Sequence, residues 1–398
     1  MLRVISKQEA VNCVLLESGQ FNLSPESIPL DQVLSRVLAV DLTAQEDVPS
    51  FDRSTVDGYA VFAADTFGAG EFMPTELQIV KEVRMGESAD FQLHRGTCAR
   101  IATGGMLPEG ADAVIMVEHT QNPGDLCLAY ASVSPGENIT RRGDDVCAGT
   151  VVLKKGTVIG KAEIGVLAAL GIDHVPVFRK PVVAVISTGD ELTCDAPNAG
   201  QVRDVNSALL SSAARAAGCD AFCYGAVKDD RVVIQNAVSE CLKQSDIVLI
   251  SGGSSAGAKD MTVQILDSLG KVHFHGIAMK PGKPTIFATV DGKPVFGLPG
   301  HPLAAYFVFR LIVCTLIRSA LCLPEETPVR FGRLSANIPS NHGREEFLCV
   351  SFNADGAVVP LHTKSGIISV LAQAAGYICV PRNTEGLSAG STVEVFAL

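Results

Sequence analysis

The sequence lacks the spaced ligand pairs that mark metal-binding or disulfide-rich proteins. Its 12 cysteines are scattered from Cys13 to Cys379, and none forms a C-x-x-C pair. The 8 histidines also lack ligand spacing, because His273 and His275 only alternate along a strand-like segment. We therefore predict reduced, mostly buried thiols and structural histidines in a reducing compartment.

Positive charge is also scarce. The chain has 32 basic against 43 acidic residues, a net charge of −11, which argues against a broad nucleic-acid surface. The most apolar run, residues 303–317, contains Arg310 and suits a buried helix better than a membrane span. The amino terminus has no basic segment followed by an apolar one and a cleavage site. We expect a cytoplasmic protein that binds neither nucleic acid nor membrane.

The amino-terminal half has helical patterns on both sides of a turn-rich region. Ser6 to Glu9 form a capping-box sequence, which predicts an opening helix. Residues 31–39 have a second helical pattern, and residues 161–170 a third that ends at Gly171. We expect the first two helices to pack against the third.

The carboxyl-terminal half alternates apolar strands with helices. Strands are predicted at 182–187, 221–224 and 247–250, which indicates a mainly parallel sheet with helices on both faces. With 398 residues several domains are needed. The expected divisions are a discontinuous helical linker domain (1–42 and 141–175), an inserted mostly β domain (43–140), an α/β domain (176–321) and a carboxyl-terminal β-barrel (322–398).

Three apolar runs of the α/β region end in glycine-rich loops with nearby charge, at 182–191, 246–260 and 294–302. Such loops turn backbone N–H groups toward an anion, and ligands of this architecture bind beyond the carboxyl ends of the strands. Lys280 and Lys283 lie between the last two loops on a segment stiffened by prolines. We therefore expect a phosphorylated ligand or an oxyanion.

The loop Ser251 to Gly257 excludes two common nucleotide sites. It has no lysine followed by serine or threonine, as a P-loop requires, and no G-x-G-x-x-G spacing. A tight strand-to-helix connection that needs glycine explains such a loop about as well as ligand binding does.

Acidic residues follow the same strands. They are Asp190 with Glu191, Asp204, Asp229 with Asp230, and Asp260. Asp204 and one of Asp229 and Asp230 are expected to cap helices. The others, if they converge beside a phosphate, favour Mg²⁺. Arg141 and Arg142 are compatible with phosphate binding or with ion pairs to Asp144 and Asp145.

Eight short motifs occur in a fixed order and resemble those of the molybdopterin molybdotransferase family, to which the carboxyl-terminal domain of gephyrin belongs. They are S-x-x-D-G-Y-A at 54–60, T-G at 103, R-R-G-D-D at 141, S-T-G-D-E-L at 187, D-x-N at 204, S-G-G at 251, K-P-G-K-P at 280 and G-L-P-G at 297. Each motif is weak alone, but the ordered set spans nearly the whole chain.

The resemblance implies a function. The α/β domain would bind molybdopterin, and the protein would insert molybdate into adenylylated molybdopterin with Mg²⁺-dependent release of AMP. A homodimer would share each active site between subunits, and the molybdopterin adenylyltransferase and acceptor molybdoenzymes are possible partners.

The resemblance also implies residue roles. Glu191, Asp229 or Asp230, and Asp260 would hold Mg²⁺ or organise the attacking group, and Lys280 and Lys283 would hold oxyanion or phosphate oxygens. Asp57 and Thr103 would reach in from the partner subunit. The substrate-binding set also includes Ser251, Gly252, Gly253, Ser255, Gly257, Pro299, His301, Pro302, Arg344 and Ser365.

One departure from the family pattern concerns His301, because most members have asparagine there. Histidine also titrates near neutral pH, so the pH profile or oxyanion preference is open. A non-catalytic carrier of the pterin nucleotide and a tungstate-inserting enzyme remain alternatives. An ordinary nucleotide-dependent phosphotransferase is disfavoured by the missing motifs.

Overall fold

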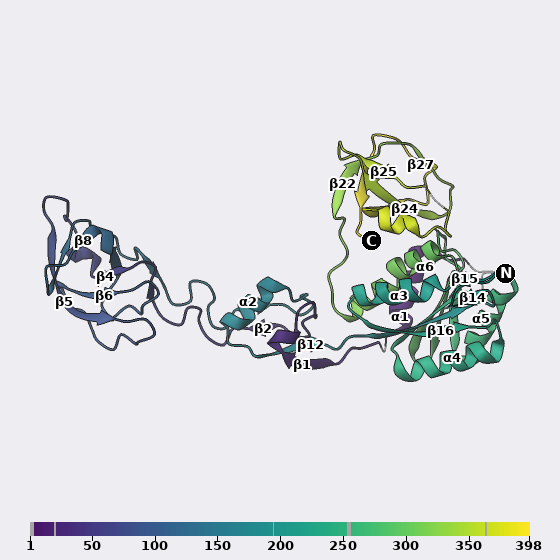
Figure 1. Cartoon of the computed structure of the whole chain (residues 1–398), viewed down its shortest axis with the longest axis horizontal. Helices are drawn as coiled ribbons and strands as arrows, with labels where there is room; N and C mark the ends of the chain where they lie inside the picture. Colours follow the sequence, from purple (N-terminus) through teal and green to yellow (C-terminus); the bar gives the residue numbers. More distant parts are fainter. Residues whose placement is uncertain (1–3, 20, 194, 253–255, 363) are drawn as a thin grey trace.

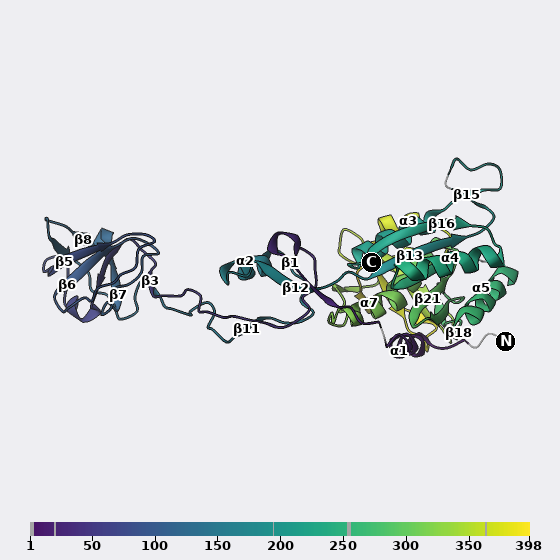
Figure 2. The same ribbon diagram turned by 90° about the horizontal axis from the view of Figure 1, so that it is seen from below.

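The protein is an elongated chain of four parts, seen here in a computed structural model (Figure 1). The structure describes residues 4–19, 21–193, 195–252, 256–362 and 364–398, without the side chains of 256–260. An inserted β domain lies at one end, a slim linker domain follows, and the α/β domain carries the carboxyl-terminal β domain at the other end (Figures 1 and 2). The expected multidomain α/β fold is confirmed.

The α/β domain is built on a six-stranded sheet of order β16-β13-β17-β21-β20-β18. The first three ladders are parallel and the last two antiparallel. The strands are β13 (Val182–Thr188), β16 (Asp220–Val227), β17 (Ile247–Gly252), β18 (Lys271–His275), β20 (Ile286–Val290) and β21 (Lys293–Leu298).

Helices cover both faces of this sheet, as its apolar strands predict. Alternate residues of β13 point to opposite faces: Val183 packs in the core beneath α3 and α6, whereas Ala184 packs in the core beneath α4 and α5. The helices are α3 (Val205–Ala216), α4 (Arg231–Gln244), α5 (Ala256–Leu269) and α6 (Pro302–Val308). The result is a three-layer domain (Figure 2).

The most apolar segment is longer than expected from the sequence. Helix α6, a π-helical turn (Phe309–Val313) and α7 (Cys314–Ala320) make one helical run, Pro302–Ala320, of 19 residues with mean hydropathy 1.7. That length and composition suffice to cross a membrane. The run nevertheless belongs to the protein core, where Phe307, Ile312 and Ile317 are fully buried.

Two expectations for the first 42 residues are wrong. Helix α1 (Lys7–Glu17) forms with its capping box, but Ala10 and Val14 pack in the α/β core rather than against residues 161–170. The pattern at 31–39 yields only a 3₁₀ turn, Leu30–Gln32. Ser35 has a left-handed φ of 63°, which ends any helix, and the next residues bridge to strands.

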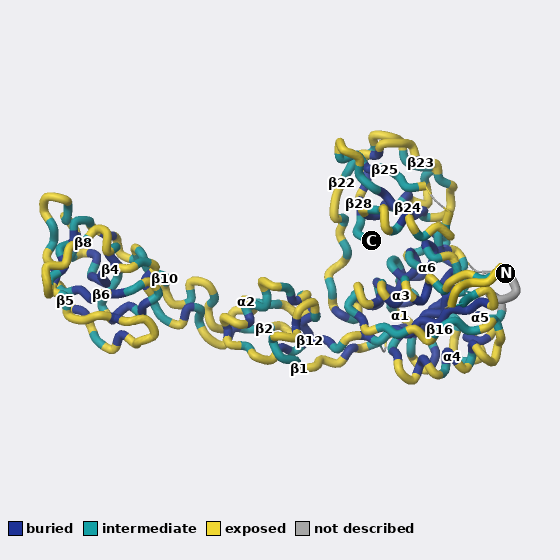
Figure 3. The backbone as a smooth tube through the Cα atoms, in the orientation of Figure 1, coloured by how far each residue is buried: buried dark blue, intermediate teal, exposed yellow. Residues whose placement is uncertain are grey.

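The linker domain joins two distant segments of the chain. Strand β1 (Pro25–Pro29) pairs with β12 (His174–Phe178), and β2 (Leu42–Thr43) pairs with β11 (Val151–Leu153). Helix α2 (Lys161–Ala169) covers them, with Leu167 and Val175 fully buried. Its buried core is small beside that of the α/β domain (Figure 3).

The inserted β domain has a six-stranded sheet of order β7-β4-β6-β5-β9-β8, with apolar clusters on both faces. Its elements are β3 (Arg53–Ser54), β4 (Gly58–Val61), a 3₁₀ turn (Ala63–Asp65), β5 (Thr75–Val83), β6 (Thr97–Ile101), β7 (Ala113–Met116), a 3₁₀ turn (Val117–His119), β8 (Thr120–Gln121), β9 (Leu126–Ala129) and β10 (Ile139–Thr140). All 11 cysteines of the described part of the chain are free, as expected.

The carboxyl-terminal β domain is tied to the α/β domain by backbone pairing. Its elements are β22 (Arg330–Arg333), β23 (Ile338–Pro339), β24 (Glu345–Phe352), β25 (Val358–Pro360), α8 (Ser369–Gln373), β26 (Gly376–Val380), β27 (Gly386–Leu387) and β28 (Thr392–Val395). Strand β19 (Met279–Lys280) leaves the α/β domain and pairs in parallel with β24. Arg310 adds a bidentate ion pair to Glu326 and a bond to Ala397 O (3.1 Å).

Candidate active site

The strands that precede the three predicted glycine-rich loops lie side by side. They are β13, β17 and β21, which are adjacent and parallel, so their carboxyl ends meet at one edge of the sheet. Two short strands, β14 (Leu192–Thr193) and β15 (Val202–Arg203), continue from β13, and residues 195–201 between them stand away from the domain (Figure 2). We call this edge of the sheet, with Asp190, Glu191, Asp204, Asp229 and Asp230, the acidic edge.

Asp229 is the most perturbed carboxylate of the acidic edge. Its Oδ1 is buried without a hydrogen-bond partner. Burial raises the pKa of Asp229, the negative charges of Asp190 and Glu191 raise it further, and a hydrogen bond from Thr188 opposes them. The backbone N–H of Asp229 donates to Asp190 Oδ1 at 3.3 Å. A cation placed here would relieve the repulsion.

The neighbouring acids Asp230 and Asp204 cap helices. Asp230 caps α4, where its Oδ1 accepts from Val232 N (2.9 Å) and Val233 N (3.0 Å). Asp204 caps α3 and also accepts from Ser187 Oγ at 2.8 Å. The structure therefore separates the two candidates, since Asp230 serves the helix and Asp229 faces the other acids.

The loop after β17 requires glycine where it begins. Gly252 has a φ of 134°, and a Cβ there would lie 2.0 Å from the carbonyl oxygen of Thr188. Buried Ser251 accepts from Asn206 Nδ2 at 2.7 Å, and the same nitrogen donates to Gly300 O at 2.8 Å. Asn206, which the sequence pointed to only as part of a motif, thus ties two of the loops together.

Several candidates fall outside the described part. Gly253 and Ser255 lie outside the described residues, and the side chain of Asp260 lies outside them too. Gly257 and Asp260 are placed only as members of α5. Among the described residues, no group of three or more histidine, cysteine or acidic side chains is arranged to hold a metal ion alone.

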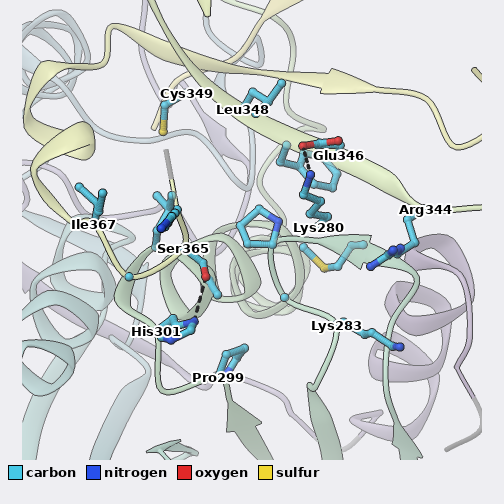
Figure 4. Close-up of a pocket in the computed structure, with 18 of the residues that line it drawn as sticks. Lys280, Lys283, Pro299, His301, Arg344, Glu346, Leu348, Cys349, Ser365 and Ile367 are labelled. Atoms are coloured by element: carbon cyan, nitrogen blue, oxygen red, sulfur yellow. Dashed lines mark hydrogen bonds and ion pairs between the residues drawn. The ribbon is translucent and has the colours of Figure 1, made fainter. Parts of the chain in front are cut away.

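A second site, the basic pocket, lies between the α/β domain and the carboxyl-terminal β domain. Figure 4 shows residues that line it. Its volume is about 760 Å³. The polar and charged residues that line it are Lys280, Lys283, His301, Arg344, Glu346, Lys364 and Ser365. Five of these carry a positive charge or can acquire one, and one is acidic. Such a cavity favours an anion.

Lys280 is held in place from the carboxyl-terminal β domain. Its Nζ lies 2.7 Å from Glu346 Oε1, and Ser340 Oγ donates to Glu346 Oε2 at 2.8 Å. Glu346 has a side chain only 9% exposed, whereas that of Lys280 is 53% exposed. The ammonium group therefore keeps donors free for the pocket. This role of Glu346 is not among the sequence-based predictions, although an acid beside the apolar residues 347–350 is a signal of a buried partner.

The turn between the two lysines packs against helix α6. Gly282 has a φ of 121°, and a Cβ there would lie 2.8 Å from Val308 Cγ2. The buried hydroxyl of Thr285 donates to Gly282 O at 2.7 Å. This packing presents the exposed Lys283 to the pocket from a fixed backbone.

Arg344 is not paired with the acids beside it in the sequence. Glu345 forms an ion pair with Lys7 at 3.8 Å, and Glu346 binds Lys280. The guanidinium of Arg344 lines the pocket on the same side as Lys283 (Figure 4).

His301 and Ser365 join the two domains on the opposite side of the pocket. His301 Nδ1 lies 2.8 Å from Ser365 Oγ, and Leu303 N donates to Ser365 O at 3.2 Å. Pro302 occupies the first turn of α6, where its missing N–H breaks no helical bond. Ser365 therefore contacts the start of α6.

The acidic edge and the basic pocket are adjacent. Pro284 and Pro299 line the basic pocket and also a small hollow lined by Gly252 at the acidic edge. A ligand with an anionic group at each end can therefore contact both regions of one subunit.

Asp57 and Thr103 lie in the inserted β domain, which the linker domain separates from both regions within one chain (Figure 1). Asp57 Oδ1 accepts from Thr103 N (2.7 Å) and Thr103 Oγ1 (2.9 Å), and these bonds lower the pKa of Asp57. Arg142 Nε donates to Asp47 Oδ2 at 2.6 Å, so an ion pair forms, but with an acid other than Asp144 or Asp145.

Comparisons with known proteins cover nearly the entire chain. Residues 5–171 match the MoeA N-terminal region (domain I and II), residues 184–319 a probable molybdopterin binding domain, and residues 332–398 the MoeA C-terminal region (domain IV). A molybdopterin molybdenumtransferase of Bacillus subtilis is 34% identical, covering 94% of this chain and 90% of its own. The chain belongs to the MoeA family, the molybdopterin molybdenumtransferases.

Further MoeA relatives agree in sequence and in structure. A molybdopterin molybdenumtransferase of Staphylococcus aureus is 32% identical over 98% of this chain and 95% of its own. A crystal structure of the molybdopterin biosynthesis MoeA protein of Pyrococcus horikoshii has a TM-score of 0.87 and 37% identity, covering 99% of both chains. The family resemblance inferred from the ordered motifs is confirmed.

Proposed function

We propose that this MoeA-family chain is a cytoplasmic enzyme that inserts molybdate into adenylylated molybdopterin and releases AMP. One observation carries the proposal most strongly. An edge rich in carboxylates, where Oδ1 of Asp229 is buried without a hydrogen-bond partner, adjoins a pocket rich in cations. A substrate that combines a phosphoanhydride with a second oxyanion needs both environments.

The basic pocket supplies the molybdate site in this proposal. Lys280, Lys283 and Arg344 offer ammonium and guanidinium donors to a tetrahedral dianion. Glu346 and Ser340 keep Lys280 in one orientation, so fewer side-chain rotamers are lost on binding. Tungstate has the same charge and shape as molybdate, so the same ammonium and guanidinium donors can bind it.

The acidic edge suits Mg²⁺ together with the phosphoanhydride. Hard carboxylate oxygens at Asp229 and Glu191, with Asp260 in the adjoining helix, are ligands that this ion prefers, and Mg²⁺ is usually held by one or two carboxylates plus substrate phosphates. When bound, Mg²⁺ would neutralise phosphate charge as AMP leaves. The fit rests on the unpartnered Oδ1 of Asp229.

The chain's own groups would position the reactants. Backbone N–H groups of the loop that begins at Gly252 would bind a phosphate. A water molecule would attack phosphorus and form a new P–O bond as the phosphoanhydride P–O bond breaks, so that AMP leaves and the pterin keeps its own phosphate. Lys280 and Lys283 would hold molybdate beside the dithiolene in the adjacent pocket. The substrate must come from an adenylyltransferase, and the product must pass to an acceptor molybdoenzyme.

A homodimer completes this proposal. Asp57 and Thr103 lie beyond the linker domain from the basic pocket of their own chain, so they would act in the site of a second subunit. Co-expressed subunits with Asp57→Ala in one and Lys280→Ala in the other should regain part of the activity that each homodimer lacks. Mixed dimers that stay as inactive as both parents would contradict a shared site.

The direct test incubates purified protein with adenylylated molybdopterin, Mg²⁺ and molybdate and follows AMP. We expect release that requires protein, oxyanion and Mg²⁺ together. If the pterin nucleotide binds but AMP appears no faster than without protein, a carrier role replaces the catalytic one. Replacing molybdate by tungstate then ranks the two oxyanions by AMP release.

A further inference from the structure

His301 and Ser365 form an inter-domain contact whose hydrogen-bond direction depends on protonation. Their polar atoms, Nδ1 and Oγ, lie 2.8 Å apart, and both residues line the basic pocket (Figure 4). A neutral imidazole can accept the serine hydrogen at Nδ1. A protonated imidazole has no acceptor there, so Nδ1–H must donate and Ser365 Oγ must accept.

That reversal determines whether the Ser365 hydroxyl can donate a hydrogen bond into the cavity. When Oγ accepts from the imidazole, its own hydrogen is released to donate elsewhere. The backbone of Ser365 is fixed meanwhile, because its carbonyl accepts from Leu303 N at 3.2 Å. An oxyanion is an acceptor only, so it is bound well by the donor state and poorly by the state in which the serine hydrogen points at the ring.

The charges around His301 couple this state to the ligand. Lys280, Lys283, Arg344 and Lys364 line the same pocket, with Glu346 already bonded to Lys280. The thiol of Cys349, whose pKa burial raises to about 11, stays neutral below pH 9. A dianion bound among these groups would attract a cationic imidazole at His301.

We propose that His301 and Ser365 form a proton-dependent oxyanion clamp, in which binding of a tetrahedral dianion takes one proton from solvent onto His301 and turns the Ser365 hydroxyl toward the anion. His301 acts through Ser365 and is a positioning residue. The inference rests on the proposed function, because it specifies how that site recognises molybdate. It concerns the position at which this chain carries histidine instead of the usual asparagine.

The test is calorimetric titration of the full-length protein with sodium molybdate and, separately, tungstate, from pH 6 to 8.5. Linkage requires affinity to fall as pH rises, by about tenfold between pH 6 and 8. Repeating the titrations in buffers of different ionisation enthalpy should show uptake approaching one proton per anion. His301→Asn should bind with an affinity that is nearly independent of pH and with no proton uptake.

Two further variants separate the clamp from a structural role. His342→Asn alters an exposed histidine outside the pocket, 3.5 Å from Glu385, and should keep the wild-type pH dependence. Ser365→Ala should weaken anion binding at every pH, by about fivefold at pH 6, and lose most of the pH dependence. A fall in thermal stability alone, with the pH slope kept in His301→Asn, would overturn the clamp.

The outcomes distinguish the two proposals. Tight anion binding that does not change with pH in wild-type protein, with AMP release intact, contradicts the clamp and leaves the proposed function standing. Absence of oxyanion binding at every pH contradicts the molybdate pocket and the clamp together.

Discussion

The acidic edge and the basic pocket carry opposite charges, and they differ in whether those charges have ion-pair partners within the chain. At the edge, the half-buried Asp229 lies near Asp190 and Glu191 with its Oδ1 buried and unpartnered, and among the described residues none of the three forms an ion pair. In the pocket, Lys280 is already bonded to Glu346 on a strand from another domain. In the proposed function a cation would therefore be supplied at the edge from outside, whereas the pocket already holds its lysine in place for an anion.

The difference also separates stability from function. The negative charges of Asp190 and Glu191 raise the pKa of Asp229, and carboxylates perturbed in this way occur preferentially at functional sites. The Lys280–Glu346 pair belongs to the pairing of β19 with β24, so it contributes both to domain contact and to binding. Each substitution below is designed to break one of these regions while the other is kept.

The largest effect is expected from Lys280→Ala. AMP release should fall by about 100-fold or more, because a donor aimed at the developing charge is lost. The variant also leaves the buried carboxylate of Glu346 without its cation, which should lower the melting temperature. The double variant Lys280→Ala with Glu346→Gln should regain stability but not AMP release, whereas joint recovery would make Lys280 structural. Lys180→Ala, whose ion pair with Asp220 spans 3.6 Å at the surface, is the matched control.

Asp229→Asn should lower AMP release by about tenfold to 100-fold and raise the Mg²⁺ concentration needed for half-maximal rate. It should also increase stability at pH 7. The pKa of Asp229 is raised in the folded state, so its favourable contribution exists at low pH and is lost as pH rises through that value. Melting curves should show the gain at pH 7 shrinking toward pH 4. A loss of stability at pH 7 would contradict the placement of Asp229 among like charges.

Glu346→Gln should have an intermediate effect. The amide oxygen can still accept from Lys280 or Ser340, but the charge that orients the ammonium is gone. We expect about a threefold to tenfold loss in kcat, with a smaller change in KM for molybdate, because the pocket becomes more positive while Lys280 becomes less ordered. Glu346→Asp, which keeps the charge on a shorter side chain, should recover less than wild type and more than glutamine. Equal rates for all three proteins would remove Glu346 from the account.

Asp230→Ala should have the smallest effect on AMP release. The side chain caps α4 through two backbone N–H groups, so its loss should reduce the free energy of unfolding by about 1 kcal/mol. The rate per folded molecule should stay near wild type. A large drop in rate without loss of stability would exchange the roles assigned to Asp229 and Asp230.

The sequence predicted the parts of the molecule that depend on local periodicity. Buried parallel strands such as 247–250 are continuous apolar runs, a capping box marked the start of helix α1, and a glycine marked the end of helix α2. It failed at residues 31–39, because pairing of Val37 and Leu38 with distant strands outweighed a helical pattern. The packing of α1 on the α/β core also depends on a distant contact, since Ile5 pairs with Ile277.

The site was predicted residue by residue only in part. The family resemblance assigned Lys280, His301 and Arg344 to the substrate site, and the structure shows all three lining one pocket. The resemblance did not show that Glu346 binds Lys280, or that His301 meets Ser365. Both contacts join segments more than 60 residues apart. They form because β19 pairs with β24 and because Ser365 contacts the start of α6.

The most direct test is anomalous diffraction from crystals soaked with tungstate and AMP, each with its own recognisable density. The account predicts tungsten in the basic pocket beside Lys280, Arg344 and Ser365, with the AMP phosphate at the acidic edge near Gly252. Tungsten bound outside the basic pocket, with Lys280 still facing only Glu346, would contradict the assignment of the two regions.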